Sequence, residues 1–195
     1  STPLWSYTTG EKVWTVAISA DGGYIAAGGN DERVYLFDKD SGTPLWNYNT
    51  LGAVGSVAIS ADGEYIVASG YRLFLFGKDD STPLWTYDTM VYEVTISADG
   101  EYIATHSEED ETDDVIYLFD KDSSTPLWSY DTGDDMDTIA ISADGEYIAA
   151  GGDNRKVYLF DKTGGDGDDD ESLLPSVSMI PALISIGLIA IYRRK

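Results

Sequence analysis

The chain repeats one short motif four times at nearly constant spacing, and this repeat limits the available folds more than any other feature. Thr-Pro-Leu-Trp starts at Thr2, Thr43, Thr82 and Thr125, so successive copies lie 41, 39 and 43 residues apart. Ile-Ser-Ala-Asp-Gly starts at Ile18, Ile59, Ile96 and Ile141, and an aromatic-Leu-Phe triplet starts at Tyr35, Phe74, Tyr117 and Tyr158. A period of about 40 residues built from short strand-like runs predicts a β-propeller.

Each repeat reads as four short strands. Apolar and small residues alternate in the first strand, as at Val16, Ala17 and Ile18, which is the period of a strand. The Asp-Gly pair that follows is a hairpin signal, because glycine tolerates positive φ. A second strand, a third with the aromatic triplet and a fourth with Leu-Trp-x-Tyr complete the unit. The predicted fold is therefore all-β, a propeller of about four four-stranded blades over residues 1–162.

The order of these strands leaves the size of the ring open. The chain opens with a fourth-type strand, and its repeats end with a third-type strand at 157–160. Four blades could close on themselves by joining these ends, or the chain could be the C-terminal part of a seven- or eight-bladed ring. We favour the larger ring. The chain starts at Ser1 with neither Met nor a signal peptide, which we interpret as processing or as a piece of a longer protein.

The aromatic residues on the fourth strand have two possible roles. Trp46 and Tyr48 lie two residues apart and so share one face of their strand. We expect them to pack against the neighbouring blade, with stacking on sugar rings as the alternative.

Composition excludes several classes of function. The formal net charge of −23 opposes binding to nucleic acid. With no cysteine and a single histidine, His106, the chain offers few means of building nucleophile–base triads or His-based metal sites. We therefore predict no catalytic residue, no cofactor and no enzyme activity.

The third repeat carries an acidic insertion at residues 108–114. We expect its carboxylates to stay solvated and to form a partner-binding surface loop, with His106 beside it as an exposed turn residue. The candidate partner-binding residues are Glu108, Glu109, Asp110, Glu111, Asp113 and Asp114.

Calcium is the one metal hypothesis. Asp38 and Asp40, and likewise Asp120 and Asp122, place alternate oxygen side chains along a turn, as hard-cation loops do. Polar turns with local hydrogen bonds are the competing interpretation.

The C-terminal part differs in composition from the repeats. Residues 163–172 form a Gly/Asp linker, and residues 173–195 form a tail. The stretch from Ser172, the last linker residue, to Tyr192 holds no charge. As a helix this stretch would span about 30 Å, the thickness of a bilayer core. We predict a transmembrane helix with a cytoplasmic basic end, which places the propeller outside the cell. The anchor residues are Leu183, Ile184, Ile186, Leu188, Ile189, Ile191, Arg193, Arg194 and Lys195.

Three resemblances follow from these motifs. Ser19-Ala20-Asp21-Gly22 and the third strand ending in Phe37-Asp38 resemble WD-repeat propellers, with Phe-Asp replacing Trp-Asp. The Leu-Trp-x-Tyr strand resembles quinoprotein propeller repeats, although no quinone site can be carried over. The tail resembles prokaryotic, above all archaeal, surface sorting signals, with Leu174-Pro175-Ser176-Val177-Ser178 at the motif position. The resemblance of the repeats to these propeller families implies that the chain is a binding platform.

We therefore expect a non-catalytic, membrane-anchored cell-surface propeller that binds proteins or surface polymers. Two alternatives stay open. One is a fragment of an extracellular lyase, hydrolase or quinone-linked dehydrogenase whose catalytic residues lie in blades outside this sequence. The other is a purely structural envelope repeat protein.

Overall fold

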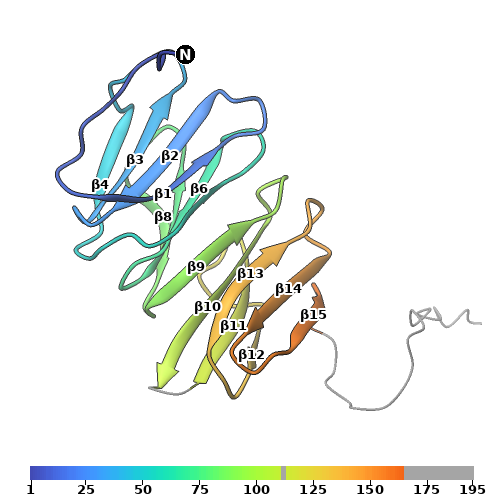
Figure 1. Cartoon of the computed structure of the whole chain (residues 1–195). Coiled ribbons are helices and arrows are strands. Elements are labelled where there is room, and N and C mark those ends of the chain that lie inside the picture. The colour runs from blue at the N-terminus through green and yellow to red at the C-terminus, as the bar shows by residue number, and fades with distance from the viewer. Residues whose placement is uncertain (111–112, 165–195) are drawn as a thin grey trace, which may run out of the picture. The chain divides into compact units, whose positions relative to one another are not determined.

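The computed structural model describes residues 1–110 and 113–164, which form fifteen antiparallel strands in four sheets (Figure 1). Three sheets have four strands and the fourth has three, each in simple sequence order. The strands are β1 (Val13–Ile18), β2 (Tyr24–Gly29), β3 (Arg33–Asp38) and β4 (Trp46–Asn49); β5 (Val57–Ile59), β6 (Tyr65–Ala68), β7 (Leu73–Gly77) and β8 (Pro83–Tyr87); β9 (Val91–Ile96), β10 (Tyr102–Asp110), β11 (Asp113–Asp120) and β12 (Trp128–Asp131); β13 (Met136–Ile141), β14 (Tyr147–Gly152) and β15 (Val157–Asp161).

The Ser-Ala-Asp-Gly motif closes the first hairpin of every sheet through one hydrogen-bond pattern. The Ser19 hydroxyl donates to Asp21 Oδ1 over 2.6 Å and accepts the Tyr24 N–H over 3.0 Å. The Ser19 hydroxyl and the Gly23 N–H together lower the pKa of Asp21 below its ordinary value. The same serine–aspartate contact recurs in the other three sheets, so the predicted hairpins are confirmed.

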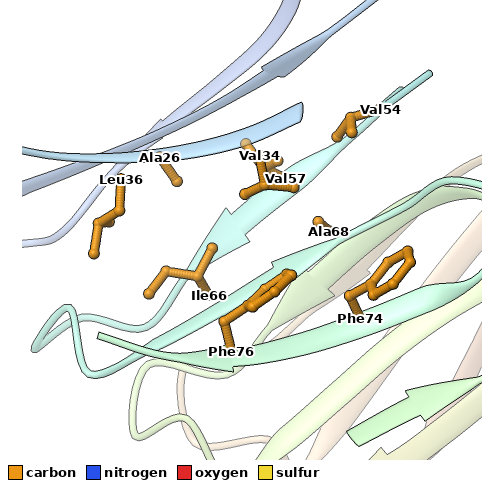
Figure 2. Close-up of a cluster of buried hydrophobic side chains, with 9 residues drawn as sticks. All are labelled: Ala26, Val34, Leu36, Val54, Val57, Ile66, Ala68, Phe74 and Phe76. Atoms are coloured by element: carbon orange, nitrogen blue, oxygen red, sulfur yellow. The ribbon is translucent and has the colours of Figure 1, made fainter. Parts of the chain in front are cut away.

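Consecutive sheets pack face to face through apolar side chains. Figure 2 shows the cluster between the first and second sheets, where Leu36 and Val34 face Ile66 and Phe76. The first strands are rich in small and β-branched residues, which suit a pleated surface that is covered on one side. Equivalent clusters join the second sheet to the third and the third to the fourth.

The fourth-strand aromatic residues lie in these interfaces, as expected. The Trp46 ring lies 5.4 Å from the Phe76 ring of the next sheet, and its Nε1 donates to the Lys78 carbonyl over 2.7 Å. Trp85 and Trp128 make the same hydrogen bond to Lys121 and Lys162. Packing between sheets therefore accounts for these tryptophans.

The fold departs from the sequence prediction at its two ends. Within the described residues β15 pairs only with β14, so the fourth sheet has three strands instead of four. The segment from Thr2 to Tyr7 is not a strand, although Trp5 stacks on Phe37 with its ring 5.3 Å away. It packs against the first sheet as β4 packs against the second, but among the described residues it lacks the strand partner that makes β4 regular.

Candidate functional site

The candidate site is a cavity of about 650 Å³ to which all four sheets contribute. Most of its lining comes from the first strands and the residues just before them, and His106 on β10 and Asp114 on β11 complete it. Its lining is Trp14, Thr15, Gly55, Ser56, Tyr92, Glu93, His106, Asp114, Asp135, Met136 and Asp137. Four of these residues are carboxylates, and lysine and arginine are absent from the lining.

A buried histidine–aspartate pair forms one wall of the cavity. His106 is 2% exposed, and its Nδ1 lies 3.0 Å from Asp114 Oδ2. The same Asp114 oxygen accepts the Met136 N–H over 2.8 Å. Because a carboxylate only accepts hydrogen bonds, His106 Nδ1 carries the proton. The other ring nitrogen, Nε2, is buried without a hydrogen-bond partner in the part of the chain that the structure describes.

The histidine occupies a position where the other sheets have small residues. In register, His106 pairs with Glu93 as Gly28 pairs with Thr15 and Gly151 with Thr138. A Cβ atom on Gly28 would lie 2.3 Å from Val54 Cγ1, so the first sheet has no room there for a side chain. The third sheet admits an imidazole at this position and thereby presents a titratable group to the cavity.

Aromatic side chains form other parts of the lining. Trp14 is largely exposed, and the Tyr92 ring is stacked on the His106 ring with centroids 6.2 Å apart. Glu93 is fixed by the Ile139 N–H, which donates to its Oε2 over 2.8 Å. An acidic cavity with exposed aromatic faces suits a cation, since carboxylates and π faces both attract positive charge.

The sequence prediction for this region was wrong in two respects. His106 was expected in an exposed turn, yet it is buried in the middle of β10. Asp114 was expected in a solvated loop, yet it is 4% exposed on β11. The reason is that the insertion lengthens a strand pair, because Ser107 pairs with Val115 and Glu108 with Asp114.

The other predicted partner-binding residues are only partly described. Glu108, Glu109 and Asp110 end β10 and Asp113 begins β11, while Glu111 lies outside the described residues. Their role in binding a partner stays a prediction.

The two candidate calcium turns have local hydrogen bonds. Asp38 Oδ1 accepts the Asp40 N–H over 2.8 Å, and Asp120 Oδ1 accepts the Asp122 N–H over the same distance. Asp40 and Asp122 also pair with the lysines that precede them. Among residues 1–110 and 113–164 no three His, Cys, Asp or Glu side chains are grouped so that they could hold a metal ion.

The predicted membrane anchor lies outside the described residues, as do the linker and tail after Gly164. Within the described part of the chain, no helix is long and apolar enough to cross a membrane. The anchoring of the chain therefore stays a prediction from its sequence.

Comparison with known proteins identifies the family. A family model described as WD domain, G-beta repeat matches residues 125–161. A second model, described as outer membrane protein assembly factor BamB, matches residues 3–109, which is more than half of the chain. No curated protein matches the chain. The four antiparallel sheets agree with both repeat families, and by its longer match the chain belongs to the propeller-repeat family described as outer membrane protein assembly factor BamB.

Proposed function

We propose that this chain is a non-catalytic binding protein of the cell surface and that its acidic cavity holds a basic side chain of a protein partner. The observation that carries the proposal is a cavity lined by four carboxylates, beside the buried His106 Nε2, which has no hydrogen-bond partner among the described residues. Since Asp114 holds the proton on Nδ1, the Nε2 of a neutral ring is an acceptor.

The lining favours a guanidinium or ammonium group over a neutral one. Asp137 and Glu93 supply negative charge, and the exposed Trp14 face offers a cation–π contact. An arginine side chain combines a planar face with five N–H donors, so it matches an aromatic wall and several acceptors together. An acidic or phosphorylated ligand would be repelled.

The same geometry supports a binding role over catalysis. A histidine–aspartate pair serves as a base only when a nucleophile or a substrate proton lies within reach of the free ring nitrogen. His106 Nε2 has no hydroxyl partner among the described residues, and Ser56 Oγ instead accepts the Val94 N–H. Among the described residues, a fixed acceptor thus lies beside the cavity without an assembled nucleophile.

The cell-surface location rests on the sequence and on the family. The uncharged residues 172–192 and the basic end Arg193-Arg194-Lys195 support a membrane anchor with the sheets outside the cell. The family's description names an outer membrane assembly factor, which supports a role in the cell envelope. Proteins are the preferred partner class, and a surface polymer with amino groups would present the same chemistry.

Binding of short labelled peptides to the full chain tests this proposal. A Gly-Gly-Arg-Gly-Gly peptide should raise fluorescence anisotropy to saturation, whereas Gly-Gly-Glu-Gly-Gly should not. Asp137→Asn and Trp14→Ala should each weaken arginine-peptide binding by about threefold. Asp79→Asn is the matched control, because it removes an exposed carboxylate that is not part of the lining. Equal binding of both peptides, or equal loss in all three variants, would overturn the proposal.

A further inference from the structure

Each sheet has two different faces, and the structure shows three times how they fit together. We call the face that meets the next sheet the forward face and the one that meets the preceding sheet the rear face. On the first sheet the forward face carries Val34 and Leu36, and on the second sheet the rear face carries Ile66 and Phe76. The interface between them is apolar and fully buried at its centre.

Backbone hydrogen bonds repeat at each of these interfaces. Ala20 N donates to Ala61 O, Ala61 N to Ala98 O, and Ala98 N to Ala143 O, each over 2.9 Å. Within the described part of the chain this series has two open ends, the Ala20 carbonyl on the first sheet and the Ala143 N–H on the fourth.

A side-chain contact to the first strand repeats in the same way. Thr15 Oγ1 of the first sheet accepts the Val57 N–H of the second. Ser56 Oγ, just before the second sheet, accepts the Val94 N–H of the third. Glu93 Oε2 of the third sheet accepts the Ile139 N–H of the fourth. By the register of β13, the next acceptor in this series is Thr138, which is exposed on the fourth sheet. The next donor is the Val16 N–H of the first sheet.

Each interface also seats a tyrosine on a glycine of the next hairpin. A Cβ atom on Gly63 would lie 2.4 Å from Tyr24 Cδ2, and Tyr65 and Tyr102 cover Gly100 and Gly145 as closely. At the open ends, Gly22 has nothing within 4 Å of its Cβ position, and the corresponding Tyr147 is exposed.

Each outer face exposes apolar side chains at positions that are buried inside the array, although Tyr35 and Phe37 on the rear face of the first sheet are buried. On the forward face of the fourth sheet, Val157 is 86% exposed and Leu159 is also exposed, whereas Val34 and Leu36 are fully buried in the first sheet. On the rear face of the first sheet, Val16 is 67% exposed, whereas its counterpart Val57 is buried.

We infer that a second copy of this chain docks head to tail, with its first sheet on the fourth sheet of this one. Its residues 5–8 would pair with β15 as β4 pairs with β3. The register of this pairing follows from β3 and β4 of the first sheet, where Leu36 lies opposite Trp46 and Arg33 lies opposite Asn49. Leu159 then faces the second copy's Trp5, and Lys156 faces its Thr8.

A second copy is the occupant because this chain carries both halves of the interface and leaves both exposed. A surface of this kind is self-complementary in the heterologous, head-to-tail sense. The contact continues an interface already present three times in the chain, with an atom-level partner for each open position. One half is preassembled, since Trp5 already stacks on Phe37 and donates to the Lys39 carbonyl as Trp46 does one sheet later.

Disulfide trapping tests the docking directly, because the chain has no cysteine. Thr8→Cys and Lys156→Cys are prepared as separate full-length chains, mixed and oxidised. Residues directly opposite on paired strands have Cβ atoms about 5 Å apart, so a two-chain species containing both variants should form. Thr2→Cys replaces Thr8→Cys in the matched control, because six residues of strand displace it by about 20 Å from Lys156. This control mixture should give at least tenfold less of the species.

Two further variants keep the inference open to contradiction. Val157→Asp in the Lys156→Cys chain should reduce trapping at least tenfold without lowering the melting temperature of the single chain, because this side chain is exposed there. No mixed species from the single-cysteine chains would overturn the inference. So would an internal disulfide in the Thr8→Cys/Lys156→Cys double variant accompanied by no mixed species, since this shows closure within one chain.

Discussion

Strands β2 and β10 are the second strands of the first and third sheets, yet a glycine of β2 makes room for the next sheet whereas a histidine of β10 lines the cavity. Both pair with a first strand in the same register, with Gly28 opposite Thr15 and His106 opposite Glu93. Gly28 is small because the next sheet's Val54 occupies the space beside it. His106 is large, buried and held by Asp114. In this array, residues that recur in every repeat form the interfaces between sheets. His106, which differs from its counterparts, gives the cavity a titratable side chain.

Removing an aromatic side chain from a repeated interface should have the largest effect on stability. Phe76 is fully buried between the first and second sheets and contacts Trp46 and Tyr48. Phe76→Ala should lower the free energy of unfolding by about 3–5 kcal/mol, as measured by urea denaturation. Leu84→Ala, at an exposed position of the same sheet, is the control and should change it by less than about 0.5 kcal/mol. Similar losses in the two variants would contradict the assignment of the core.

Loss of the His106–Asp114 pair, which occurs in one sheet, should have the next largest effect on the free energy of unfolding. Asp114→Ala leaves His106 Nδ1 and the Met136 N–H without their acceptor, which should cost about 3 kcal/mol because both donors are buried. Asp114→Asn keeps an acceptor oxygen and should cost less than half as much. Denaturation of both variants checks this. If the alanine variant is as stable as the wild type, the pair is not a structural support of the cavity.

Loss of the hairpin serine should have a smaller effect that is equal in different sheets. Ser60 and Ser97 are both fully buried and bond Asp62 and Asp99 in the same way. Ser60→Ala and Ser97→Ala should each cost about 1–2 kcal/mol. A difference between them larger than about 1 kcal/mol would show that these repeated positions are not equivalent, and would weaken the contrast with His106.

Lowering the pH should have the smallest effect on stability, and this loss of stability should arise from the aspartates of the repeated hairpins. The serine hydroxyl and a backbone N–H lower the pKa of Asp21 and of Asp144 below 3.8 in the folded chain. A lowered folded-state pKa adds stability above the ordinary value, and this stability is lost as pH falls through the folded-state pKa. Thermal unfolding measured from pH 5 down to pH 2 should therefore show a shallower decline in an Asp144→Asn variant. An unchanged slope would contradict this origin.

The sequence predicted the repeated part of the fold and missed the part that does not repeat. The Asp-Gly hairpins, the strand order and the packing of Trp46 on the next sheet all follow from local patterns that recur four times. Periodicity averages such signals and makes them reliable. It carries no information about an insertion that occurs once.

His106 and Asp114 were missed because the nine charged or polar residues 106–114 resemble a solvated loop in sequence. Their burial depends on the pairing of β10 with β11, which continues through Ser107 and Val115 into the insertion. A signal was present, since alignment of the repeats places His106 in the column of Gly28, Ser69 and Gly151. A histidine in a column of small residues indicates a cavity rather than a turn.

The central claim is that the cavity beside His106 binds a basic group, and the chain's single histidine allows a direct test. The imidazole gives one set of nuclear magnetic resonance signals, which can be followed as N-acetyl-arginine amide is added. We predict a saturable shift of the His106 Nε2 signal that is weakened by Asp137→Asn and unaffected by Asp79→Asn. An imidazole spectrum that stays unchanged up to saturating arginine amide would contradict the claim.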